Sequence, residues 1–137
     1  MFKFHNLFFI CFLFLGLSAC KTQELVAEQS NTDKLPKIKG VRTSFTDAIL
    51  VDNKIYFLAS AENSNSTYDD GEVLGSIIGR IDVKKMKIDF TQKISDTHKF
   101  EGLTLYKKSS NEIEFLLCED NDTEVLEADV YKVVLSK

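Results

Sequence analysis

The stretch Ile55-Tyr56-Phe57-Leu58-Ala59-Ser60-Ala61-Glu62 decides the fold, because its pattern returns as Ile113-Glu114-Phe115-Leu116-Leu117-Cys118-Glu119-Asp120. Both are apolar runs typical of buried strands, and both end in acidic residues. Neighbouring runs match in the same order, since 46–51 aligns with 100–105 and 79–82 aligns with 131–134. The matched positions are 52 to 58 residues apart, a spacing typical of a propeller blade rather than of a helical repeat.

Seven short runs rich in Ile, Val, Leu, Phe and Tyr are predicted to be strands, and turn-forming residues separate several of them. The first set covers 46–51, 54–61, 74–82 and 86–94, and the second covers 100–106, 112–118 and 126–135. No segment carries a sustained helical stripe. The predicted fold class is therefore all-β and antiparallel, with about two propeller-type blades that form a partial β-propeller or an open β-sandwich-like unit.

Within the first set, the runs differ in how their apolar residues are distributed. Runs 46–51 and 54–61 are apolar on both faces, as expected of inner strands that lie between neighbouring layers. Run 86–94 alternates, with Met86, Ile88 and Phe90 expected to point one way. This run is therefore predicted to be the half-solvated outer strand of its blade.

An apolar run at the N-terminus ends in Leu17-Ser18-Ala19-Cys20 and follows a short basic segment that contains Lys3. This arrangement resembles the signal peptides of bacterial lipoproteins, in which the thiol of the final Cys carries the lipid. The resemblance implies lipidation of Cys20, and Lys21 rather than Asp after it favours the outer membrane. The alternatives are an ordinary signal peptide or an N-terminal membrane helix, but the run is shorter than the roughly 20 residues that span a bilayer.

Three segments follow from these patterns. Residues 1–19 are predicted to be the lipoprotein signal peptide, and 20–42 the lipidated Cys with a flexible linker. Residues 43–137 are predicted to form the partial propeller-like domain. Blade one is expected over 44–94, and an incomplete blade two over 99–136.

Composition excludes several classes of function. A formal net charge of −4 gives no basic surface for nucleic acid. Once the signal peptide is removed, Cys118 is the only Cys besides the lipidated Cys20, so it is expected to pack in a strand as a small apolar residue. His98 is then the only His, and it is expected on an exposed polar link, which disfavours zinc binding and His-dependent nucleophilic catalysis.

The segments led by Phe45-Thr46-Asp47-Ala48 and Phe100-Glu101-Gly102, each followed by its apolar run, carry a further resemblance. They resemble the last blades of an uncharacterised bacterial β-propeller family that is related to phytase-like and gluconolactonase-like propellers. In such propellers, acidic residues at strand ends gather around a central channel. In the gluconolactonase-like group, the Glu of a Glu-Gly motif is a divalent-metal ligand, which the resemblance assigns to Glu101. This chain has fewer than the four blades that a closed propeller needs.

The candidate metal ligands are the acidic residues at equivalent strand ends: Asp47, Glu62, Glu101 and Asp120. If they converge on one rim, their oxygens suit Ca²⁺, which prefers hard ligands.

Two functions remain open. The first is a lipid-anchored module of the cell envelope that has no catalytic activity and binds a protein partner or a second copy through its blade edges. The second is a calcium-dependent hydrolase of the phosphatase or lactonase type, active when an oligomer or a partner completes the channel. The Glu101 carboxylate distinguishes them, because only the hydrolase needs it as a metal ligand.

Overall fold

A computed structural model describes residues 35–64, 71–120 and 129–137, and this part of the chain is built from strands without a helix. Each of the seven predicted strands is present, and the predicted ends that can be compared differ by up to two residues. The predicted start of the last strand, residue 126, lies outside the described residues. Two further short strands precede these seven. In chain order the strands are β1 (Lys37–Ile38), β2 (Val41–Arg42), β3 (Ser44–Val51), β4 (Lys54–Asn63), β5 (Glu72–Asp82), β6 (Lys87–Ser95), β7 (Phe100–Lys108), β8 (Glu112–Glu119) and β9 (Val130–Ser136).

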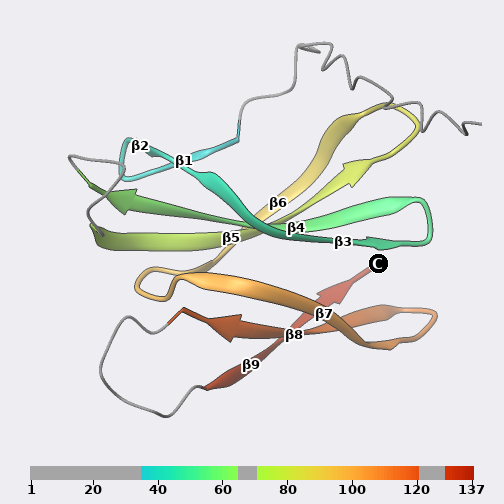
Figure 1. The fold of residues 1–137 in the computed structure, drawn as a ribbon. Coiled ribbons are helices and arrows are strands. Elements are labelled where there is room, and N and C mark those ends of the chain that lie inside the picture. Colours follow the sequence, from blue (N-terminus) through green and yellow to red (C-terminus); the bar gives the residue numbers. More distant parts are fainter. Residues whose placement is uncertain (1–34, 65–70, 121–128) are drawn as a thin grey trace, which may run out of the picture.

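The strands form three antiparallel sheets in chain order: the hairpin β1-β2, the four-stranded sheet β3-β4-β5-β6 and the three-stranded sheet β7-β8-β9. Figure 1 shows them as three layers, with the four-stranded sheet between the hairpin and the three-stranded sheet. The predicted all-β, antiparallel fold class is thus confirmed, and the strands of the described residues form open sheets without a closed barrel.

Two apolar clusters hold the layers together. One lies between the two larger sheets and includes Leu58, Ile78 and Phe115, each fully buried. The other lies between the four-stranded sheet and the hairpin and includes Ile38 and Phe57. Because neighbouring residues of a strand face opposite sides, Phe57 and Leu58 of β4 belong to different clusters.

A glycine makes room for the largest side chain under the hairpin. Phe57 of β4 lies opposite Gly79 of β5, and a Cβ at Gly79 would be only 2.1 Å from the Cζ of the Phe57 ring. The ring therefore lies directly over the glycine.

The alternation expected for β6 is wrong in one respect. Ile88 packs against the cluster under the hairpin, whereas Phe90 packs against the cluster between the sheets. A register shift in the β5–β6 pairing causes this, because Ile88 lies opposite Ile81 and Phe90 opposite Arg80. The extra residue, Asp89, turns the following side chains to the other face of the sheet.

The hairpin β1-β2 lies within residues 20–42, the segment predicted to be a flexible linker. Its turn residues Lys39 and Gly40 both have positive φ, 50° and 85°, as in the tight turns that match strand twist. The Thr43 hydroxyl donates a 2.9 Å hydrogen bond to the Pro36 carbonyl oxygen. Two-residue strands have too few residues to show a period, and what holds Ile38 is its burial against the sheet.

Candidate functional site

The predicted site residues fall into three groups. Cys20 lies outside the described residues. Glu62 near the end of β4, Glu101 near the start of β7 and Asp120 just after β8 come together, whereas Asp47 in β3 has separate contacts.

A lysine ammonium lies where the three acidic side chains converge. Lys99 Nζ is 3.1 Å from Glu62 Oε1, 3.1 Å from Glu101 Oε1 and 3.4 Å from Asp120 Oδ2. The Lys99 side chain is only 13% exposed. Burial acts to lower its pKa, but the hydrogen bonds to Glu62 and Glu101 outweigh burial, so the pKa is raised above 10.5. Lys99 therefore remains charged at neutral pH.

This arrangement, the Lys99 cluster (Lys99, Glu62, Glu101 and Asp120), places an internal cation where the sequence suggested a metal ion. Within the ranges 35–64, 71–120 and 129–137, no group of three or more His, Cys, Asp or Glu residues is arranged to hold a metal ion. Lys99 was missed as a member because it lies in the polar link between the two larger sheets. Its position directly before Phe100-Glu101-Gly102 is the only sequence signal that pointed to it.

Asp47 joins the two larger sheets. Its Oδ2 accepts a 2.6 Å hydrogen bond from the Leu103 backbone N–H of β7, and its Oδ1 accepts a 2.7 Å bond from the Ala48 N–H. Beside it, the Thr46 hydroxyl donates a 2.6 Å bond to the Phe100 carbonyl oxygen. Asp47 and Thr46 therefore link β3 to β7 of the three-stranded sheet by hydrogen bonds.

A buried hydroxyl organises the link between the sheets. The Ser76 hydroxyl donates a 2.6 Å bond to the His98 carbonyl oxygen and accepts a 3.3 Å bond from the Phe100 N–H. It also lies 2.7 Å from the Ser60 hydroxyl oxygen, and Ser76 is fully buried.

His98 is held by a carboxylate between aromatic rings. Its Nδ1 is 2.7 Å from Glu119 Oε1, while Tyr131 donates a 3.0 Å bond to Glu119 Oε2. The ring stacks on Phe100 at 5.8 Å, and its side chain is 40% exposed. The hydrogen bond to Glu119 raises the pKa of Tyr131. Glu119 and the aromatic rings therefore fix the orientation of the His98 ring.

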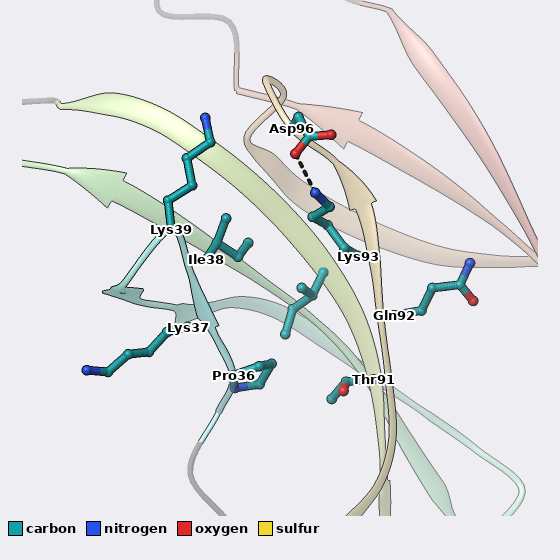
Figure 2. A pocket seen from close by; sticks show the side chains of 9 residues that line it. Pro36, Lys37, Ile38, Lys39, Thr91, Gln92, Lys93 and Asp96 are labelled. Atoms are coloured by element: carbon teal, nitrogen blue, oxygen red, sulfur yellow. Dashed lines mark hydrogen bonds and ion pairs between the residues drawn. The ribbon is translucent and has the colours of Figure 1, made fainter.

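A pocket of about 300 Å³ lies between the hairpin and β6. Figure 2 shows Ile38 directed toward the four-stranded sheet, Lys37 and Lys39 directed outward, and Lys93 bonded to Asp96. The lysines therefore do not converge to form an anion site.

Among the described residues there is no helix that is long and apolar enough to cross a membrane.

The outer face of the three-stranded sheet exposes apolar side chains. Val130 and Val134 of β9 are 62% and 45% exposed. Leu116 on β8 is half-buried, and Cys118, expected to be packed, is exposed. Cys118 lies opposite Gly102 and Val130, so its side chain shares the outer face with Val130 rather than either apolar cluster.

Comparison with models of known protein families gives a match. The chain matches, over residues 5–135, the model of a family described as a family of unknown function (DUF6929). The chain belongs to this family. The match to DUF6929 extends from the expected signal peptide through most of β9. Neither the curated proteins nor the solved structures give a match to this DUF6929 chain.

Proposed function

We propose that this DUF6929 protein is a lipid-anchored module of the bacterial cell envelope that binds a protein partner through an open sheet edge. The observation that carries the proposal is the exposed apolar strand β9, with Val130 and Val134 at the end of a sheet. Exposed strand edges with apolar side chains are the surfaces on which β-strand addition occurs.

The Lys99 cluster supports a binding role over the metal-dependent hydrolase. Lys99 neutralises part of the charge of Glu62, Glu101 and Asp120 at the point where a metal ion would need their oxygens. A divalent ion would have to displace the ammonium and break three charged contacts.

The anchor and the envelope location are supported by the lipobox Leu17-Ser18-Ala19-Cys20. The sheets β3–β6 and β7–β9 have the consecutive strand order expected of propeller blades. We propose that they derive from a propeller of which this chain retains about two blades.

The test of the anchor is metabolic labelling of the full chain with palmitate in a bacterial host, followed by membrane fractionation. We expect wild type to carry label and to sediment with the outer membrane, whereas Cys20→Ser carries none. Cys118→Ser is the matched control, because it removes an exposed thiol and is expected to keep the label. An unlabelled wild type would overturn the anchor.

Elemental analysis of the purified chain tests the alternative. We expect calcium content to be the same in wild type and Glu101→Gln. Stoichiometric calcium that is lost in Glu101→Gln would replace the binding role with the hydrolase.

A further inference from the structure

We infer that a second copy of this chain occupies the β9 edge, pairing β9 antiparallel to β9 so that two three-stranded sheets become one six-stranded sheet. The inference deepens the proposed function, on which it rests for the assignment of binding to this edge. It also predicts a single register, centred on Val133.

The β9 edge is the most regular edge of the larger sheets. The pairings that involve the other edge strands, β3, β6 and β7, each contain a register shift, which bends a strand and hinders edge-to-edge pairing. The β8–β9 pairing has none over its whole length. The strand also lacks proline, and the charge of Lys132 is paired with Glu114 at 3.1 Å.

The backbone groups that face the open side follow from the ladder. The Lys137 N–H donates a 2.8 Å bond to the Asn111 carbonyl oxygen of the neighbouring strand segment. In an antiparallel ladder, the bonded residues alternate with residues whose N–H and C=O point away. The residues of β9 whose backbone N–H and C=O point toward the open edge are therefore Val130, Lys132, Val134 and Ser136, and we call them the outward-pointing residues. In the described part of the chain no strand pairs on that side.

Charge complementarity selects both the occupant and the register. When two copies pair with Val133 opposite Val133, Asp129 of each copy lies opposite Lys137 of the other, and Tyr131 lies opposite Leu135. Opposite charges and apolar pairs across strands are favourable.

A shift of this register is less favourable. Centring the pairing on Lys132 places two ammonium groups opposite each other, and centring it on Val134 leaves Asp129 without Lys137. The Val133 register also bonds the outward-pointing groups in pairs, since Lys132 then faces Val134 and Val130 faces Ser136.

The interface is small, because one strand of seven residues forms it. A stable dimer in dilute solution usually buries about 1,200 Å² or more in total. We therefore expect weak association in detergent and stronger association when both copies are held on one membrane, where their effective concentration is high.

Cysteine cross-linking of the full chain in its host membrane tests the register. In a Cys118→Ser background, Val133→Cys places two thiols at a non-hydrogen-bonded pair, where the Cα atoms are about 4.5 Å apart. After oxidation with copper phenanthroline, we expect a disulfide-linked dimer from Val133→Cys. The same background with Lys132→Cys or Val134→Cys, and the background alone, are expected to remain monomeric.

Charge exchange tests the complementarity. Asp129→Lys replaces two attractive pairs by two repulsive ones, and we expect about a tenfold weaker dimer in Val133→Cys cross-linking, since 1.4 kcal/mol is tenfold. Adding Lys137→Asp to the same chain restores opposite charges and is expected to restore cross-linking. Failure of the double exchange to restore it would overturn the proposed register.

A proline variant separates pairing from folding. Val134→Pro removes an outward-pointing N–H, so the monomer keeps its ladder to β8 while the dimer loses a bond. We expect unchanged circular dichroism and loss of cross-linking. If Val134→Pro is folded and cross-links as well as its parent, the edge is not the interface.

Palmitate labelling of the same samples separates this inference from the anchor. A labelled chain in which Val133→Cys gives no dimer overturns self-pairing and leaves the anchor standing. An unlabelled chain that cross-links at Val133→Cys overturns the anchor and supports self-pairing.

Discussion

The Asp47 carboxylate accepts a 2.6 Å hydrogen bond from the backbone N–H of Leu103, so a side chain of β3 satisfies a backbone group of the three-stranded sheet. The two residues are 56 positions apart, close to the spacing of the internal repeat. The contact therefore joins one repeat to the next.

Asp47→Ala is expected to destabilise the fold by about 1–3 kcal/mol, because the Leu103 N–H loses its acceptor in a partly buried site. Asp47→Asn should cost less, since its amide oxygen can still accept the bond. Urea unfolding measures both. The control is Lys108→Ala, which removes the exposed ion pair with Asp52 and should change stability little. Equal effects of Asp47→Ala and Lys108→Ala would contradict the role of Asp47.

Ser76→Ala is expected to cost about 1–3 kcal/mol, because it leaves the His98 carbonyl and the Phe100 N–H without their buried partner. Ser60→Ala should cost less, since it removes only the contact between the hydroxyls. The double variant should cost less than the sum of the two, as expected for residues in one network. Full additivity in thermal or urea unfolding would count against a shared network.

Gly79→Ala is expected to destabilise by about 1–3 kcal/mol, because its Cβ would overlap the Phe57 ring and force it to move. Phe57→Leu in the Gly79→Ala chain should recover part of this loss, since the smaller side chain leaves room for the methyl group. Chemical denaturation of the two single variants and the double variant measures the coupling. Absence of any recovery would show that the ring is not the obstacle.

Lys99→Met leaves Glu62, Glu101 and Asp120 facing one another without their cation, and should cost about 1–3 kcal/mol. The three carboxylates are then free to bind a hard cation. We therefore expect added calcium to raise the melting temperature of Lys99→Met but not that of wild type. A similar calcium response in both chains would mean that the ammonium does not take the place of the ion.

Acid should weaken a group of ion pairs on the four-stranded sheet, in which Lys54 pairs with Asp82 and Asp89, and Arg80 pairs with Asp89. The hydrogen bond from Lys54 lowers the pKa of Asp82 below 3.8. For Asp89, burial acts to raise the pKa, but the bonds from Arg80 and Lys54 outweigh it and the pKa is lowered.

Carboxyl groups with a lowered pKa in the folded state stabilise it above their unfolded value, and this contribution is lost as pH falls through the folded value. The stability advantage of wild type over Lys54→Met should therefore be present at neutral pH and shrink as pH falls below 3.8. Unfolding curves at several pH values test this, and a constant difference would contradict it.

Much of the fold could be predicted because the strands follow hydrophobic patterns that depend on local sequence. The turn at Asp52-Asn53 is an example, since both residues adopt the positive φ, 49° and 32°, that such turns require. The opposite facing of Ile88 and Phe90 could not be predicted, because the bulge at Asp89 depends on pairing with β5.

The convergence of Glu62, Glu101 and Asp120 followed from their equivalent strand ends. The position of the Lys99 ammonium between these carboxylates could not be predicted, because packing in the folded chain sets where a long, unbranched lysine side chain reaches. Asp47 departs from its repeat partners because the Leu103 N–H is within reach of its short side chain.

The division of β4 between two apolar clusters has a consequence for how the molecule opens. Phe57 and Leu58 are adjacent in the chain yet anchor different layers. A fluctuation that separates either layer must disturb the backbone that supports the other. We therefore expect the three layers to unfold together, and the amides of β4, whose side chains enter both clusters, to be among the slowest to exchange with solvent.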